Sequence, residues 1–239
     1  MTSRIYTNLA EVYDALWGHL TRQYVSLVNH VLFDHGLTYV RVIDFACGTG
    51  SLACQMGKKG HLVHGIDISP AMVKIARTKT WDLPNVTFAV QDMMQFSANS
   101  VYDVATCTFD SLNYLLAETE VRTFVKAITR ALKPGGLFIF DINTEHMYAH
   151  YQEDILQHNL NGKRFFQRLS YNANQKIATA VFEFTDGTME IHRQAAYSYA
   201  TIKKILKSAR MRVVNAYSDF NGRGFRSGDE RLICVAVKR

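Results

Sequence analysis

The stretch Val42-Ile43-Asp44-Phe45-Ala46-Cys47-Gly48-Thr49-Gly50 decides the fold that we predict for this chain. An apolar run at 40–45 leads into a turn of small residues, and a helix is predicted to begin near Ser51. In a doubly wound sheet, such a strand–turn–helix junction is where a nucleotide-like cofactor binds. Gly48 and Gly50 lack a Cβ, so the backbone can approach a ligand closely. The local pattern leaves two alternatives open: a turn that needs glycine only for its shape, or a general dinucleotide-binding fold.

Length and composition indicate one globular domain with an insertion. The chain has 239 residues, of which 48% are hydrophobic and 20% charged, so it can bury a full core and is not of the disordered type. No apolar run has the length of a membrane span, and the first residues lack a basic stretch followed by an apolar signal core. We therefore expect a cytoplasmic protein without a membrane partner.

Neither the cysteines nor the charges predict a metal or nucleic-acid site. The cysteines form no C-x-x-C pair, so we expect reduced structural thiols and no metal. The net charge is +6, and residues 199–239 carry ten Lys or Arg against three Asp or Glu. A solvated helix face explains these charges better than a nucleic-acid footprint, because aromatic residues are not interleaved with them in the predicted helix. Nucleic acid is thus disfavoured as a partner, and the sequence gives no indication of oligomeric state.

Strands and helices alternate after the glycine turn. Besides the strand at 40–45, strands are predicted at 61–66, 86–90, 102–107, 137–142, 212–217 and 231–237. Helices are predicted at 70–79, where Ser69 is the N-cap, at 121–132 and at 198–209. This order predicts an α/β fold with a Rossmann-like, doubly wound, seven-stranded sheet.

Two regions depart from the alternation. Residues 6–34 predict two helices separated at Gly18, with Thr21 as the N-cap of the second. Residues 145–198 predict a helix at 146–156 and then an antiparallel β meander, whose alternating runs lie at 164–171, 177–184 and 188–197. The turns in the meander are Asn172-Ala173-Asn174 and Asp186-Gly187.

The pattern Asp44-x-Ala46-Cys47-Gly48-Thr49-Gly50 resembles the first motif of class I S-adenosylmethionine-dependent methyltransferases. The dinucleotide fingerprint G-x-G-x-x-G is not met, because Ala53 stands where its third glycine would be. The resemblance covers residues 6–142 well, including Leu-Lys-Pro-Gly-Gly before the strand at 137–142, and the C-terminal strands loosely. It implies S-adenosylmethionine as the cofactor and an antiparallel last strand.

The resemblance also implies how the domain is divided and where the cofactor lies. Residues 1–144 and 199–239 would form the cofactor-binding domain with an N-terminal helical lid, and 145–198 an inserted antiparallel β cap that roofs the active site and sets substrate choice. Asp67, 23 residues after Asp44, is placed to accept the ribose hydroxyl protons. Asp92 and Met93 would contact adenine, and Tyr13 and Arg22 the methionine carboxylate. The expected cofactor-binding residues are Tyr13, Arg22, Asp44, Ala46, Gly48, Gly50, Asp67, Ile68, Asp92, Met93 and Thr108.

The segment after the fourth strand points to the methyl acceptor. Asp110-Ser111-Leu112-Asn113-Tyr114 lacks the motifs of nucleic-acid methyltransferases and resembles small-molecule enzymes, including glycine, sarcosine and amino-sugar N-methyltransferases. The resemblance implies a small-molecule acceptor and favours an amine nitrogen over oxygen. Asp110 or Tyr114 could take the amine proton, directly or through water. Alternatively, Asp110 caps a helix at Ser111 and Tyr114 is a core aromatic. Possible substrate contacts in the insertion are His146, Tyr148, His192, Arg193 and Tyr197.

Other functions stay open at this point. They are O-methylation of a small metabolite, RNA modification through the basic C-terminal segment, and cofactor or partner binding without catalysis. A dehydrogenase is disfavoured by the glycine spacing.

Overall fold

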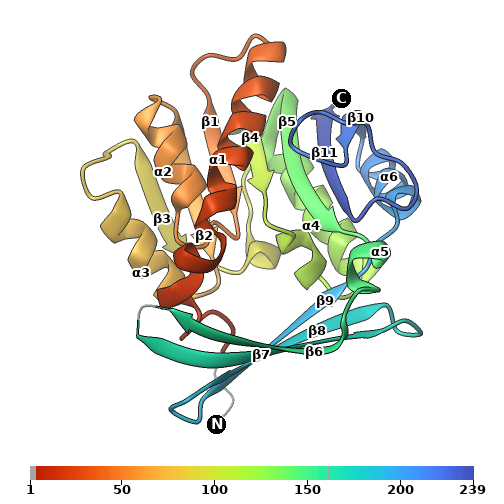
Figure 1. Cartoon of the computed structure of the whole chain (residues 1–239). Helices are drawn as coiled ribbons and strands as arrows, with labels where there is room; N and C mark the ends of the chain where they lie inside the picture. The colour runs from red at the N-terminus through yellow and green to blue at the C-terminus, as the bar shows by residue number, and fades with distance from the viewer. Residues whose placement is uncertain (1–3, 161) are drawn as a thin grey trace.

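Two β-sheets form the framework of the computed structural model, which describes residues 4–160 and 162–239 (Figure 1). The strands of the larger sheet are β1 (Arg41–Phe45), β2 (Leu62–Asp67), β3 (Val86–Val90), β4 (Tyr102–Cys107), β5 (Leu132–Asn143), β10 (Met211–Tyr217) and β11 (Arg231–Lys238). Their order is β10-β11-β5-β4-β1-β2-β3. Strands β1 to β5 are parallel neighbours, whereas β11 runs antiparallel to β5. The predicted Rossmann-like sheet with an antiparallel last strand is therefore confirmed.

Helices cover both faces of this sheet. One face carries α1 (Ala10–Asp34), α2 (Ser51–Lys58) and α3 (Pro70–Lys79), and the other carries α4 (Glu118–Ala131) and α6 (Tyr199–Ser208) (Figure 1). The short elements are η1 (Met93–Gln95), η2 (Ser111–Tyr114) and α5 (Glu145–Tyr148). Because side chains alternate along a strand, Val42 of β1 packs with the first group of helices and Ile43 with the second.

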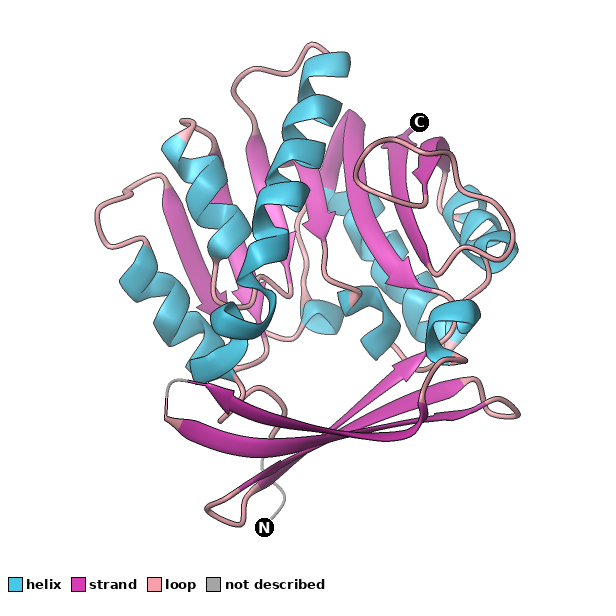
Figure 2. Cartoon of the chain, viewed as in Figure 1, coloured by secondary structure: helices cyan, strands magenta, loops and turns pink. Residues whose placement is uncertain are grey.

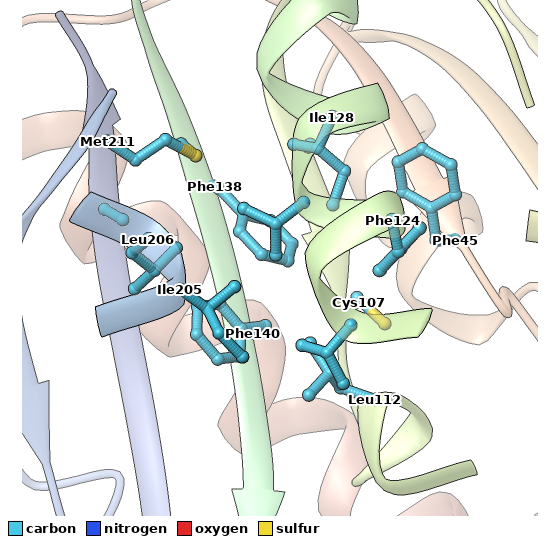
Figure 3. Close-up of a cluster of buried hydrophobic side chains, with 14 of the residues drawn as sticks. Phe45, Cys107, Leu112, Phe124, Ile128, Phe138, Phe140, Ile205, Leu206 and Met211 are labelled. Atoms are coloured by element: carbon cyan, nitrogen blue, oxygen red, sulfur yellow. The ribbon is translucent and has the colours of Figure 1, made fainter. Parts of the chain in front are cut away.

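Aromatic rings fill the core between the sheet and helix α4 (Figure 3). The rings of Phe138 and Phe140 stack at 4.5 Å between centroids. Phe124 of α4 meets Phe45 edge-to-face at 4.9 Å, a favoured geometry for aromatic pairs. Phe45 is the last residue of β1, so this packing fixes the strand end from which the glycine turn begins.

Helix α1 is continuous, so the prediction of two helices separated at Gly18 is wrong. Glycine inside a helix costs about 1 kcal/mol relative to alanine. That cost does not break α1, because the helix is buried on both sides of Gly18: Val12 packs against the second sheet and Val28 against the central sheet. Thr21 lies within the helix instead of capping a new one. Within the described part of the chain, no helix has both the length and the apolar character needed to cross a membrane.

The second sheet is antiparallel and lies across the carboxyl ends of the central strands (Figure 2). Its strands, in spatial order, are β6 (Gln152–Leu160), β7 (Lys163–Asn172), β8 (Ile177–Phe184) and β9 (Met189–Ala195). The three predicted runs correspond to β7, β8 and β9. The predicted helix at 146–156 is wrong beyond α5, because this segment instead pairs with β7 as an edge strand. Its sequence has no clear period, and cross-strand pairing decides its structure.

The start of α1 packs directly against the second sheet. Leu9 and Val12 share a buried apolar cluster with Phe165, Phe182 and Phe184, which come from β7 and β8. Residues 6–9, which we call the N-terminal segment, therefore lie between the two sheets, next to the glycine turn.

One aromatic ring explains why small residues are needed around that turn. The ring of Phe88 on β3 lies against Gly65 on β2, with which it is paired in register. A Cβ on Gly65 would be 2.6 Å from this ring and 2.9 Å from the free thiol sulfur of Cys47. A Cβ on Gly50 would be 2.8 Å from the same ring. Phe88 thus occupies the space that side chains at either glycine would need.

We expect the substitution Gly65→Ala to lower the free energy of unfolding by about 1–3 kcal/mol, because the added methyl group overpacks the core. Chemical denaturation measures this value. Gly224→Ala is the matched control, since no heavy atom lies within 4 Å of its hypothetical Cβ and its backbone angle is ordinary. Equal effects of the two substitutions would show that Phe88 moves aside without cost.

Candidate active site

Backbone conformation shapes the turn after β1. Ala46, Gly48 and Gly50 have φ values of 50°, 56° and 71°, in the left-handed region that side chains disfavour. A Cβ on Gly48 would meet no heavy atom within 4 Å, whereas one on Gly50 would be 2.7 Å from the Cβ of Ala76 on α3. Gly48 therefore faces open space where a ligand can approach the backbone, and Gly50 is needed for packing under the turn.

A cavity of about 280 Å³ opens at the carboxyl ends of β1, β2 and β3. This volume is near the lower end of the range for small-molecule sites. The N-terminal segment and the start of α1 close the cavity with Tyr6 and Tyr13. Its lining brings together, from the residues predicted by sequence, Tyr13, Ala46, Gly48, Asp67, Ile68, Asp92, Met93 and Tyr114.

The carboxylate of Asp67 is fixed by two backbone amides. Its Oδ2 accepts a hydrogen bond from Gly48 N at 2.9 Å, and its Oδ1 accepts one from Ser69 N at 2.8 Å. Burial raises the pKa of Asp67. A carboxylate has about four lone-pair positions, so Asp67 can still accept hydroxyl protons from a ligand. Ser69 caps α3 as predicted, by accepting from Met72 N, and its hydroxyl donates to the Tyr6 carbonyl at 2.7 Å.

Asp92 follows β3 in the chain and lines the cavity. Its Oδ1 accepts a hydrogen bond from Met94 N at 2.8 Å and so caps η1. This contact fixes the orientation of the carboxylate but uses only part of its acceptor capacity. Met93 and Ile68 add apolar surface on this side.

Arg22 lines a neighbouring hollow instead of the cavity. Asp14 and Lys79 belong to the same hollow, where Lys79 Nζ and Asp14 Oδ2 form an ion pair at 2.7 Å. The Thr49 hydroxyl donates to Asp14 Oδ1 at 2.6 Å. These contacts fasten α1 to the residue that follows Gly48.

Asp44 and Thr108 are buried near the cavity and do not line it. Asp44 is 2% exposed and accepts a hydrogen bond from Thr106 Oγ1 at 2.6 Å. Burial raises the pKa of Asp44 to about 7, against the opposing effect of this bond. Thr108 is buried, and its carbonyl accepts from the Ser111 hydroxyl at 2.7 Å. Among the residues that the structure describes, Asp44 and Thr108 are not part of the cavity lining, whereas Ser111 is.

Asp110 occupies a strained turn beside the cavity. Phe109 and Asp110 have φ values of 59° and 48°. Asp110 Oδ2 accepts from Gln194 Nε2 at 2.5 Å, and its backbone N donates to Asp141 Oδ2 at 3.1 Å. Burial raises its pKa to about 6. Its side chain makes no capping bond to η2, so the capping alternative is not the one adopted. Non-glycine residues in this region are costly, and such strain is concentrated at functional sites.

A chain of buried polar groups runs from the cavity into the second sheet. The hydroxyl groups of Tyr6 and Tyr114 share a hydrogen bond of 2.6 Å. The Tyr114 hydroxyl is 2.9 Å from His192 Nδ1, and His192 Nε2 is 3.4 Å from Glu190 Oε2. Burial raises the pKa of both tyrosines well above the ordinary value. Tyr114 is thus not merely a core aromatic, since it belongs to the cavity lining and its hydroxyl is hydrogen-bonded to Tyr6 and His192.

The sequence interpretation did not single out Tyr6 or Glu190. A signal was present, however: Glu190, His192 and Gln194 alternate along one strand, so their polar side chains share a face. Among the other insertion residues considered, Tyr197 donates to the Leu115 carbonyl and Tyr148 is completely buried.

Glu190 holds the N-terminal segment in place. Its side chain is fully buried, and it accepts hydrogen bonds from the backbone N–H groups of Tyr6 (2.7 Å), Thr7 (3.0 Å), Asn8 (2.5 Å) and Leu9 (3.2 Å). These amides precede α1, except that of its N-cap Leu9, and a negative charge is favoured near a helix N-terminus. Burial acts to raise the pKa of Glu190, but hydrogen bonds from His192 and from the backbone outweigh it, and the net pKa is lowered.

Comparison with known proteins agrees with this geometry, which is typical of α/β proteins that bind a nucleoside cofactor. Residues 42–136 match the family model described as a methyltransferase domain. A protein of Geobacillus sp. (strain WCH70) that is named as a methyltransferase is 32% identical over 247 residues, covering 98% of this chain and 99% of the relative.

Solved structures share the fold. A crystal structure of an S-adenosylmethionine-dependent methyltransferase from Clostridium acetobutylicum ATCC 824 has a TM-score of 0.85 at 22% identity, over 98% of each chain. CalS10 from Micromonospora echinaspora, an amino pentose methyltransferase with bound S-adenosylmethionine, has a TM-score of 0.69 at 18% identity, over 95% of this chain and 97% of CalS10. The chain belongs to the class I S-adenosylmethionine-dependent methyltransferases.

We expect the substitution Glu190→Gln to loosen the N-terminal segment. An amide places an N–H group among backbone donors, and the unsatisfied contact costs about 1–3 kcal/mol. Hydrogen exchange at the amides of residues 6–9 should therefore become faster, by the factor in the opening equilibrium that this free energy represents. In the wild-type protein, Glu190 has a lowered pKa in the folded state, so its contribution is complete above its unfolded-state pKa and disappears as the pH falls through the lower folded value.

The control for this experiment is Glu183→Gln. Glu183 pairs with Arg168 at the surface of the second sheet, and such pairs contribute little. Unchanged protection of residues 6–9 in the Glu190→Gln protein would contradict the assigned role of Glu190.

Proposed function

We propose that this methyltransferase transfers its methyl group to a small-molecule acceptor, with an amine nitrogen favoured over oxygen. The observation that carries the proposal is the cavity itself. Its lining combines two fixed carboxylates, Asp67 and Asp92, with two hydrogen-bonded tyrosines, Tyr6 and Tyr114. The similarity to an amino pentose methyltransferase supports an amine acceptor.

The residues present fit S-adenosylmethionine. Asp67 would accept the ribose hydroxyl protons, Asp92 would accept from the adenine amine, and Met93 would pack on the base. The backbone at Ala46 and Gly48 would lie along the ligand, and Ile68 would cover the ribose side. Tyr13 would close over the methionine end. Asp44, Gly50 and Thr108 would act indirectly: they would maintain the shape of the glycine turn and of the strand ends beside the cavity. A role for Arg22 in holding the carboxylate stays a prediction, because Arg22 lines the neighbouring hollow.

When bound, S-adenosylmethionine supplies an electrophilic methyl group and a neutral thioether as the leaving group. The protein has to align the acceptor and exclude water, and alignment alone lowers a barrier by up to about 7–11 kcal/mol. The Tyr114 hydroxyl lies at the cavity, so it would contact the acceptor and receive its proton. Asp110 is outside the cavity lining and held by Gln194, so it would act through water.

Residues 145–198 would form the cap that selects the acceptor, inserted into a cofactor domain made of 1–144 and 199–239. The cap supplies His192 and Gln194, which contact Tyr114 and Asp110 on the acceptor side. The N-terminal segment, which packs against this second sheet through Leu9, would act as the lid.

The experiment that tests the proposal measures production of S-adenosylhomocysteine with a panel of acceptors. The panel contains amino sugars, glycine, sarcosine, hydroxylated metabolites and RNA. Turnover with an amine supports the proposal. Turnover with only a hydroxylated metabolite or only RNA, or with none of them, would contradict it.

Substitution of Asp67 by Asn should weaken binding of S-adenosylhomocysteine by about 10–100-fold, since hydrogen bonds to a charged group contribute about 1.5–3 kcal/mol. Isothermal titration calorimetry gives the dissociation constant. Asp82→Asn is the matched control, because Asp82 is exposed and distant from the cavity lining. If both variants bind as the wild-type protein does, Asp67 does not hold the ribose.

A further inference from the structure

We propose that His192, supported by Glu190, is the proton acceptor for the methyl acceptor's nucleophilic group, and that Tyr114 carries the proton to it. This inference rests on the proposed function. It assigns the proton to a histidine of the second sheet instead of Asp110, and it gives Glu190 a role in addition to holding the N-terminal segment.

The direction of each hydrogen bond in the chain follows from Glu190. Four backbone N–H groups point at its carboxylate, so that carboxylate is an acceptor for His192 as well. His192 therefore carries a proton on Nε2, and in a neutral imidazole Nδ1 is then an acceptor. Tyr114 donates its hydroxyl proton to Nδ1, and Tyr6 in turn donates to the Tyr114 oxygen.

This arrangement leaves one acceptor position on the Tyr114 oxygen. A phenolic hydroxyl has two lone pairs, and Tyr6 uses one of them. Tyr114 lines the cavity, so the second lone pair is available to an N–H group of the substrate. Tyr6 acts as a positioning residue, because its hydrogen bond limits rotation of the Tyr114 hydroxyl.

The groups around His192 suit a buried proton acceptor. Its side chain is 3% exposed, and the ring of Phe182 on β8 meets it edge-on at 5.1 Å. The titratable groups that face it are Glu190 on its own strand, Tyr114 on η2 and Tyr6 on the N-terminal segment. Asp67 and Asp110 act on the two phenols at longer range. An imidazolium formed here would lie opposite a carboxylate, in the same order as the base and acid of a Ser-His-Asp triad.

Bonds, protons and charge are all conserved in the proposed transfer. A neutral amine nitrogen uses its lone pair to form the new N–C bond, while the C–S bond breaks and its electron pair stays on sulfur. The methylated nitrogen then has one extra proton and a positive charge. That proton moves to the Tyr114 oxygen as the Tyr114 hydroxyl proton moves to His192 Nδ1. The product amine becomes neutral, and the charge resides on the imidazolium next to Glu190.

The first test needs no substrate and reads the hydrogen bonds directly. Nitrogen-15 NMR of histidine-labelled protein reports the tautomer of each imidazole, and loss of a signal in the His192→Gln protein assigns His192. We expect a proton on Nε2 and none on Nδ1, with an Nδ1 shift that changes in the Tyr114→Phe protein. His158→Gln is the matched control, because His158 is also in the second sheet but bonds to Gln167. A proton on Nδ1 would overturn the proposal.

The second test uses the panel amine that is methylated, whether amino sugar, glycine or sarcosine. Both Tyr114→Phe and His192→Gln should lower kcat by about 10²–10⁴-fold with little change in KM, and both should abolish the rise of kcat with pH. The double variant should lose no more than either single variant, because the residues act as one unit. His158→Gln should behave like the wild-type protein.

The outcomes separate this inference from the proposed function. If no amine is methylated, the proposed function fails, and the NMR tautomer still decides the hydrogen-bond order. If an amine is methylated and His192→Gln keeps the wild-type kcat and pH dependence, the inference fails alone. Tyr114→Phe preserves the size of the ring, so it gives the same answer should His192→Gln not fold.

Discussion

Closure of the site depends on a buried carboxylate that binds four consecutive backbone amides. Glu190 belongs to the second sheet, whereas the amides belong to the segment that precedes α1. The interaction joins residues more than 180 positions apart and satisfies donors that the helix start would otherwise leave unpaired. It helps to hold Tyr6 in the cavity lining. The apolar contacts of Leu9 and Val12 with the second sheet reinforce this contact but do not specify its register.

A second carboxylate, that of Asp67 in the central sheet, also joins separate segments by accepting hydrogen bonds from backbone amides. Asp67 connects the glycine turn to the start of α3 through Gly48 N and Ser69 N. Ser69 then reaches the Tyr6 carbonyl, so the N-terminal segment is bound from both sheets. The cavity is thus enclosed by two fixed acids and one segment between them. Its closed volume follows from these contacts and not from the sheet alone.

The part of the fold that is determined locally was predictable from the sequence. The strand ending at Phe45, the turn at Gly48 and the capped helix after Ser69 depend on short-range periodicity and turn chemistry. The continuity of α1 through Gly18 was not predictable in this way, because burial along the whole helix outweighs a small local cost. The strand β6 depends on its neighbour β7, which no local pattern reveals.

The candidate site also contains residues that could be predicted from the sequence and residues that only the tertiary structure brings together. Asp67 was predicted from its position after a strand, and Asp92 and Tyr114 from the family resemblance; all three line one cavity. Arg22 was predicted from the family resemblance and lines another hollow, because a helix rotates about 100° per residue and a small error of register changes the face. Glu190 and Tyr6 meet only through tertiary structure, although the polar residues at alternate positions of β9 marked an unusual strand.

The alternation along β9 also constrains how such proteins can diverge. Glu190, His192 and Gln194 all project toward the site because they are two residues apart. Insertion or deletion of a single residue between them would turn part of this set to the opposite face of the sheet. The length of β9 therefore decides which side chains face the site, whereas the turn at Asp186-Gly187 can change length without disturbing this register.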